Sequence, residues 1–178
     1  VGPLAERVPP VLSNLSVFWW THTEDESAAK GQNDSICNMH EVAMVHNVCR
    51  ALLTSDVDPS RLVVLTGYAL QKREIQRCFE KEARNTNATQ LKEIEVATID
   101  EFQGNERDIV ILSLVRTDKP GFMSLCNRII VALSRQKLSL IIIGRLKVFD
   151  SIPQWKTIIS HLQDTNAIWP VLNFKCPR

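Results

Sequence analysis

Three short apolar runs constrain the fold of this chain more than any other feature. They are RLVVLT at residues 61–66, IVILSLV at residues 109–115 and LSLIIIG at residues 138–144. Each run is too short for a buried helix, and none shows the alternation of polar and apolar residues that is typical of a half-exposed strand. Strands of this kind are buried on both faces, as in parallel sheets that helices cover.

Segments with helical periodicity separate these runs. Residues 39–53 form one such segment, with Asn38 as a predicted N-cap and Glu41 at the position of a capping box. The further predicted helices are 68–84, 122–137 and one or two short ones within 148–163, and the further predicted strands are 15–20 and 94–98. The core face of the helix at 68–84 is predicted to be Leu70, Ile75, Cys78 and Phe79. The alternation predicts an α/β layer fold with a mostly parallel central sheet.

The 178 residues suit one domain, which we predict to span residues 15–165. The Pro-rich start, residues 1–14, is interpreted as a linker or boundary segment, and residues 166–178 as an irregular C-terminal tail. The polar, acidic stretch at 21–35 is predicted to be an exposed loop. Because the chain lacks an initiator Met, we expect it to be a piece of a longer protein.

Composition excludes several classes of protein. The 21 basic and 20 acidic residues nearly cancel, so no global charge indicates a nucleic-acid partner, although a local basic patch is compatible with this balance. No apolar run reaches the length of a membrane span. The five cysteines show no CxxC spacing and are interpreted as reduced thiols of an intracellular protein, cytoplasmic or nuclear or both.

Functional residues in parallel sheets collect at the carboxyl ends of the strands. This rule selects the segments TGYALQK, TIDEFQGNE, RTDKPG and GRLK. A fifth candidate is the helix NRIIVALSRQK, in which Arg128, Arg135 and Lys137 are predicted to share one end of an element. The chain has no GxxxxGK[ST] loop and no GxGxxG fingerprint, and its four histidines lack metal-ligand spacing. We therefore expect no metal site, and a nucleotide site only as one half of a shared one.

The residues also resemble a known family. VATIDEFQGNERDIVILSLVRT followed by NRIIVALSRQKLSLIIIG is similar to motifs V and VI of superfamily 1 helicases, and VLTGYALQKREI resembles motif IV of their up-frameshift-like group. The resemblance runs from about residue 38 to about residue 162, with the motif order intact. Within the group, the chain most resembles the NFX-type zinc-finger helicases that are associated with RNA silencing.

The resemblance implies the second RecA-like domain of a two-domain motor. Such a domain has a three-layer fold of the P-loop NTPase type but lacks its own phosphate loop. ATP with Mg²⁺ would bind in the cleft between the two motor domains, and the metal ligands would lie on the first domain. Arg135 matches the motif VI arginine that reaches the γ-phosphate, and Glu106 matches the motif V glutamate near the nucleotide. Without the motifs, Arg135 would be better interpreted as a surface arginine on an amphipathic helix, and the alternative for Glu106 is a solvated acid beside Arg107.

The remaining nucleotide contacts implied by the resemblance lie in motifs IV and V. They are Tyr68 as the aromatic that stacks on adenine, Gln71, Lys72, Gln103 and Gly104. Relatives usually carry arginine where this chain has Lys72, so the bidentate fork of a second phosphate contact is lost. The alternative for Tyr68 is a packing role in the first turn of its helix.

Contacts to nucleic acid are implied at strand ends and in motif VI. The candidates are Thr66, Thr98 and Arg116, each with loop capping or surface solvation as its alternative, and Ser134 of motif VI. Phe102 is expected in the core rather than under a base. RNA is the expected substrate, with DNA as an alternative, because the family contains both activities.

The leading hypothesis is therefore the C-terminal motor domain of an ATP-dependent RNA helicase or translocase. The isolated domain is expected to be inactive. Its expected partners are RNA, the first RecA-like domain, and RNA-silencing or RNA-decay proteins, with no membrane. The alternative hypothesis is a catalytically silent RecA-like module that binds RNA or protein as a scaffold.

Overall fold

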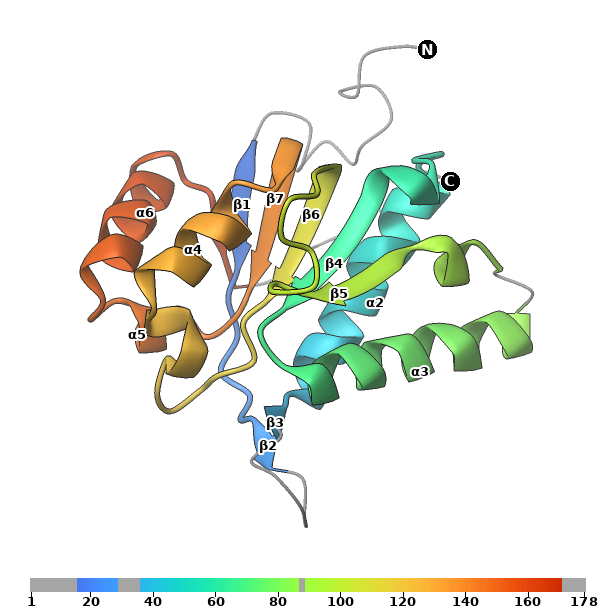
Figure 1. Cartoon of the computed structure of the whole chain (residues 1–178), viewed down its shortest axis with the longest axis horizontal. Coiled ribbons are helices and arrows are strands. Elements are labelled where there is room, and N and C mark those ends of the chain that lie inside the picture. The colour runs from blue at the N-terminus through green and yellow to red at the C-terminus, as the bar shows by residue number, and fades with distance from the viewer. Residues whose placement is uncertain (1–15, 29–35, 87–88, 171–178) are drawn as a thin grey trace.

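The central element is a six-stranded sheet in which every pairing is parallel (Figure 1). The computed structural model describes residues 16–28, 36–86 and 89–170. The strand order is β5 (Glu95–Thr98), β4 (Leu62–Thr66), β6 (Arg107–Ser113), β7 (Gln136–Ile143), β1 (Val17–Trp20) and β8 (Ile168–Trp169). A small antiparallel ribbon, β2 (Ser27–Ala28) and β3 (Ile36–Cys37), leads into the first long helix.

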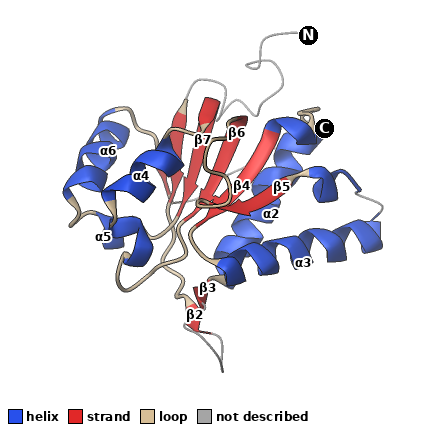
Figure 2. Ribbon diagram, in the orientation of Figure 1, coloured by secondary structure: helices blue, strands red, loops and turns tan. Residues whose placement is uncertain are grey.

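Helices cover both faces of the sheet (Figure 2). One face carries α2 (Met39–Thr54) and α3 (Ala69–Thr86), with the 3₁₀ turns η2 (Pro59–Arg61) and η3 (Thr89–Glu93). The other face carries the turn η4 (Gly121–Ser124), α4 (Cys126–Leu133), α5 (Leu146–Phe149) and α6 (Pro153–Asp164). The predicted three-layer α/β architecture is confirmed.

Each central strand contributes to two separate cores because alternate side chains point to opposite faces. In β6, Ile111 packs with the α2 and α3 helices, whereas Val110 and Leu112 pack with α4 to α6. All three side chains are fully buried. The unbroken apolar runs in the sequence are therefore explained by burial on both sides, and Phe102 lies in the second core as expected.

Three expectations about element boundaries were wrong. The segment 122–137 is not one helix, because the chain forms η4, then α4, and enters β7 already at residue 136. Arg128 consequently lies in the first turn of α4, Arg135 beyond its end and Lys137 in a strand. The three cations therefore do not share one end of an element.

The predicted tail and the predicted loop are also more ordered than expected. Residues 168–169 of the tail form β8, because they pair with β1 at the edge of the sheet. Within the stretch 21–35, His22 is buried and residues 27–28 form β2, while residues 29–35 lie outside the described part. Residues 1–14 and 171–178 are likewise not described.

The start of α2 departs from the predicted capping box. Asn38 is the N-cap as predicted, and its Oδ1 accepts the backbone N–H groups of His40 and Glu41. The side chain of Glu41 does not return to the Asn38 amide, however. That amide donates to Gln71 Oε1 at 2.8 Å, and Glu41 is turned into the protein. A long-range partner has therefore replaced the local one.

The second core contains a tight aromatic group whose removal should be costly. Trp155 is fully buried, packs against Trp19 and Phe149 at ring-centroid distances of 5.4 Å, and donates its indole N–H to Met123 O at 2.8 Å. We expect Trp155→Ala to lower the free energy of unfolding by about 3–5 kcal/mol, measured by denaturant titration. The exposed neighbour substitution Lys156→Ala serves as the control. A loss below about 1 kcal/mol would contradict this packing.

Candidate functional site

The carboxyl ends of β4 and β5 bring together two segments that the sequence singled out. Lys72, in the first turn of α3, donates from Nζ to both carboxylate oxygens of Glu101 at 2.8 and 2.9 Å. The same carboxylate accepts the Thr98 backbone N–H at 2.7 Å, and Thr98 Oγ1 accepts the Glu101 N–H at 3.3 Å. The Lys72 ion pair, followed by the Thr98 amide, lowers the pKa of Glu101 below its usual 4.5.

Tyr68 directly precedes α3 but is not open to a ligand. Its side chain is buried, and its ring is covered by Phe122 at a centroid distance of 5.7 Å. Burial raises the pKa of its phenol. Phe122 itself is half exposed, with the Arg128 guanidinium over its ring at 4.7 Å. Adenine stacking on Tyr68, which stays a prediction, would require Phe122 to move.

Arg116 occupies the segment that follows β6 at the same edge. Its Nε lies 3.2 Å from Glu26 Oε1 in a largely buried ion pair. Thr117 donates its backbone N–H to the same carboxylate, and its Oγ1 accepts the Glu26 N–H at 3.0 Å. Thr66 is fully buried at the end of β4, and its hydroxyl has no partner among the described residues.

Glu106 and Arg135 lie at the opposite edge of the sheet. The loop at 99–106 leaves β5 at its carboxyl end and returns to the amino end of the parallel strand β6. The Arg107 backbone N–H, directly after Glu106, donates to Arg135 O at 3.0 Å. The segment TIDEFQGNE therefore starts at the carboxyl edge of the sheet, where Lys72 lies, and ends at the amino edge, where Arg135 lies.

The Arg135 side chain is held by three acceptors. Its Nε donates to Val131 O at 3.0 Å, one terminal nitrogen to Asn105 O at 3.4 Å, and the other to Ser134 Oγ at 2.9 Å. The contacts fix the guanidinium beside the loop that carries Gln103, Gly104 and Glu106, all exposed. Gly104 has a φ of 89°, a left-handed conformation that favours glycine. Ser134 thus supports Arg135 and does not lie at a strand end.

Gln71 was predicted to contact nucleotide, but the structure places it in the core. It is fully buried, and its Nε2 donates to Asn38 O at 3.2 Å and to Ser113 Oγ at 2.9 Å. The predicted core face of α3 also changes, because Gln71 and Ala83 are buried while Leu70 and Cys78 are half-buried. In this structure Gln71 connects α3 to α2 and β6.

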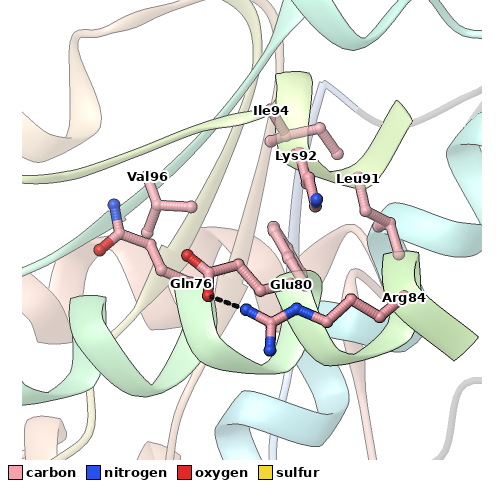
Figure 3. A pocket seen from close by; sticks show the side chains of 8 residues that line it. Gln76, Glu80, Arg84, Leu91, Lys92, Ile94 and Val96 are labelled. Carbon is pink, nitrogen blue, oxygen red and sulfur yellow. Dashed lines mark hydrogen bonds and ion pairs between the residues drawn. The ribbon is translucent and has the colours of Figure 1, made fainter. Parts of the chain in front are cut away.

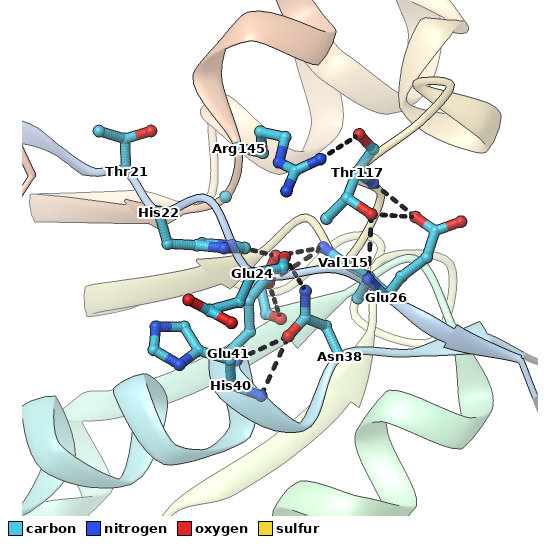
Figure 4. A network of polar contacts seen from close by, with 12 residues as sticks. Thr21, His22, Glu24, Glu26, Asn38, His40, Glu41, Val115, Thr117 and Arg145 are labelled. Atoms are coloured by element: carbon cyan, nitrogen blue, oxygen red, sulfur yellow. Dashed lines mark hydrogen bonds and ion pairs between the residues drawn. The ribbon is translucent and has the colours of Figure 1, made fainter.

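Sequence reasoning missed the partner of this network, Glu41. Its carboxylate is fully buried and lies between the end of β6 and His22 (Figure 4). The sequence did contain a signal for this role. Glu41 is an acidic residue on the buried side of α2, where water cannot hydrate its carboxylate, so it needs hydrogen-bond donors from the protein. The capping-box pattern gave a local explanation for that residue, which proved wrong.

A pocket of about 450 Å³ lies away from all of these residues (Figure 3). It is formed by α3, η3 and β5, with the ion pair of Glu80 and Arg84 at its rim. None of the predicted nucleotide or nucleic-acid residues lines it. We assign no ligand to it.

The residues that are present fit one part of an ATP site. Arginine has five N–H donors, and only three of those on Arg135 are used by described contacts. The donors left over suit a phosphate oxygen. Within the described residues, no group of three or more His, Cys, Asp or Glu side chains is placed to hold a metal ion.

Comparison with known proteins decides the family. A family model described as an AAA domain matches residues 5–147, which is most of the chain. The chain belongs to this family. Its motifs and its parallel sheet fit the second RecA-like domain of an up-frameshift-like superfamily 1 helicase.

Three relatives illustrate the range of the family. NFX1-type zinc finger-containing protein 1 of Homo sapiens is 33% identical over 174 residues, which is 96% of this chain and 9% of that protein. A regulator of nonsense transcripts 1 homolog of Arabidopsis thaliana is 35% identical, covering 93% of this chain and 13% of its own length.

The third is a helicase required for RNAi-mediated heterochromatin assembly 1 of Schizosaccharomyces pombe. It is 34% identical over 89% of this chain and 16% of its own length. The chain therefore spans about a tenth to a sixth of the length of these relatives. In the part of this RecA-like domain that the structure describes, no helix has the length and apolar character needed to cross a bilayer.

The Lys72–Glu101 pair gives a prediction for pH dependence. Because the pKa of Glu101 is lowered in the fold, the pair stabilises the domain above about pH 4.5 and loses this effect as the pH falls through the lowered pKa. We expect Lys72→Met to raise the pKa of Glu101, though not fully to 4.5, since the Thr98 amide still donates to it.

The measurement is an NMR titration of the Glu101 carboxyl carbon. Arg77→Met, which removes an exposed cation on the same helix, is the matched control and should leave the Glu101 titration unchanged. An unaltered Glu101 pKa in the Lys72 variant would contradict the ion pair.

Proposed function

We propose that this domain is the C-terminal motor domain of an ATP-dependent RNA helicase or translocase. In this proposal it supplies Arg135 as the arginine finger, together with the motif V residue Glu106, to an ATP site shared with the first RecA-like domain. The motif IV residue Lys72 lies at the other edge of the sheet, so the ATP site is proposed without it. The observation that carries the proposal is the fixed Arg135 guanidinium beside the Glu106 loop, in a member of a helicase family. We propose RNA rather than DNA as the substrate, because the names of two relatives refer to nonsense transcripts and to RNAi.

For phosphoryl transfer, this domain needs to supply little more than a correctly positioned cation. Phosphoryl transfer develops negative charge on the equatorial oxygens, and an arginine finger stabilises that charge. Arg135 suits this role because three backbone and side-chain acceptors pre-organise it while part of its fork stays free. Glu106 and the Gln103–Gly104 turn would line the same cleft. ATP would arrive with Mg²⁺, which the first domain would hold.

The nucleic-acid contacts are proposed at the opposite edge. Thr98 is partly exposed at the end of β5, and Arg116 follows β6. Such contacts to phosphate and sugar give binding without sequence preference. As the structure stands, Thr66 could contribute through neighbouring backbone only, because its side chain is fully buried. Partners from RNA silencing or decay belong to the same proposal.

One observation favours a second candidate, a RecA-like scaffold without ATP turnover. Lys72, which replaces the usual motif IV arginine, has its charge paired with both oxygens of Glu101. A nucleotide phosphate would have to displace Glu101 from this cation. The arginine-finger experiment separates the two candidates, because a scaffold has no turnover to lose.

The first functional prediction concerns Arg135. In an intact helicase with both motor domains, we expect Arg135→Ala to lower RNA-stimulated ATP turnover by about 10³–10⁵-fold, the usual worth of an arginine finger. Turnover is measured by phosphate release. Arg77→Ala on the solvent side of α3 is the control and should retain full activity. Equal turnover in wild type and the Arg135 variant would refute the finger, and absent turnover in wild type would favour the scaffold.

The second functional prediction concerns Arg116. If its guanidinium contacts an RNA phosphate, Arg116→Ala should weaken single-strand RNA binding about tenfold. It should also reduce the slope of log affinity against log salt by about 0.7, the value of one phosphate contact to a single strand. Fluorescence anisotropy at several salt concentrations measures both. Arg84→Ala, at the far end of α3, is the matched loss of charge and should change neither.

A further inference from the structure

Glu41 is the centre of a buried polar network behind the proposed RNA edge (Figure 4). Its carboxylate accepts the Ser113 hydroxyl at 2.6 Å, the Val115 backbone N–H at 3.0 Å and His22 Nε2 at 3.0 Å. Ser113 in turn accepts from Gln71 of α3 at 2.9 Å. The carboxylate is fully buried, so these donors replace water as its partners.

The backbone that Glu41 holds is in an unfavourable conformation. Val115 has a φ of 70°, in the left-handed region that a β-branched residue rarely adopts. Such a conformation persists only where the surroundings impose it. The Val115 N–H is bound by both oxygens of Glu41, at 3.0 Å each, and its side chain is fully buried. The turn at Val115 ends β6 and redirects the chain.

The residues after this turn are those that face the edge. Arg116 follows Val115 directly, and Thr117 comes next. Their direction is therefore set by the backbone at Val115. Glu26 binds both of them, and Arg145 donates to Thr117 O at 3.0 Å. Among these contacts, the carboxylate of Glu41 is the one that binds the Val115 amide itself.

We propose that Glu41 is a positioning residue for the RNA-binding edge: it holds Val115 in the left-handed conformation and so directs Arg116 toward the backbone of single-stranded RNA. The inference rests on the proposed function, since it requires Arg116 to contact RNA. Glu41 does not itself touch RNA, because it is fully buried. Through Ser113 and Gln71 the same carboxylate also fixes the start of α3, which carries Lys72 at that edge.

The chemistry of the site requires a carboxylate rather than an amide. Three donors converge on Glu41: a hydroxyl, a backbone N–H and an imidazole N–H. Both oxygens of a carboxylate accept, whereas a glutamine side chain has one oxygen and an NH₂ group that only donates. In Glu41→Gln one of the two oxygens that share the Val115 N–H becomes an NH₂ group, so this amide loses one of its two acceptors and faces a donor instead. The substitution keeps shape and volume, so it removes the charge and the second acceptor oxygen without creating a cavity.

The test is a double-mutant cycle in an intact helicase with both motor domains, with an oligouridylate single strand as the probe. We expect Glu41→Gln to weaken RNA binding about as much as Arg116→Ala, about tenfold. The double variant should be no weaker than Arg116→Ala alone, because Glu41 acts through Arg116. Additive losses would overturn the inference. The control is Val48→Ala in the core face of α2, which removes buried volume away from the network and should leave RNA affinity unchanged.

A second readout does not depend on RNA. Amide hydrogen exchange at residues 115–117 should be faster in Glu41→Gln than in wild type or in Val48→Ala. Adding Val115→Gly should restore RNA affinity in part, because glycine adopts a positive φ without strain. A folded double variant that recovers nothing would overturn the inference. Should Glu41→Gln not fold, Ser113→Ala removes one donor to the same carboxylate, and the same two measurements apply.

The outcomes separate the inference from the proposed function. Wild-type affinity and exchange in Glu41→Gln, with weak binding in Arg116→Ala, would overturn the positioning role alone. Faster exchange in Glu41→Gln, with wild-type RNA affinity in Arg116→Ala, would overturn the RNA contact of Arg116. It would still support the conclusion that Glu41 fixes the backbone of residues 115–117.

Discussion

Burial of the sheet on both faces is the constraint from which the rest of the structure follows. Because helices cover each face, polar side chains carried by the sheet meet solvent mainly at the two ends of the strands or in the loops that connect them. The candidate residues divide accordingly. Lys72, Thr98 and Arg116 lie at the carboxyl edge, and Glu106 and Arg135 lie at the amino edge.

Two short segments connect these edges. The loop at 99–106 crosses the height of the sheet, and α4 crosses beside it over eight residues, about 12 Å. Each segment has an ion pair or hydrogen bond at both ends: Asp100 binds Arg128 at the carboxyl edge, and Asn105 binds Arg135 at the amino edge. In the proposed motor, these two segments join the nucleotide edge to the RNA edge.

The sequence predicted the layers and five of the six strands of the main sheet, because burial leaves an apolar run in each of them. The two-residue strands β2, β3 and β8 are too short to carry such a pattern. The sequence also located the segments around Lys72, Arg116 and Arg135, because motif spacing is local information. The roles of Gln71 and Glu41 could not be predicted in this way. Gln71 matched a motif and Glu41 matched a capping box, but each found a stronger partner far away in the sequence, across the core. Local patterns do not contain the competing donors, so they cannot decide between two hydrogen-bonding partners.

The ion pairs at the carboxyl edge bear on how a near-neutral domain would bind RNA there, as proposed. Four cations there already have an acidic partner: Lys72 with Glu101, Arg116 with Glu26, Arg128 with Asp100 and Arg145 with Asp25. At these four positions an RNA phosphate would exchange with a carboxylate instead of meeting a free cation. The exchange is inexpensive where the pair is exposed, because such pairs contribute only about 0–1 kcal/mol. It is harder at Arg116, whose pair with Glu26 is largely buried. The direction of the Arg116 backbone, and not the sum of charge, should therefore decide how well this edge binds RNA.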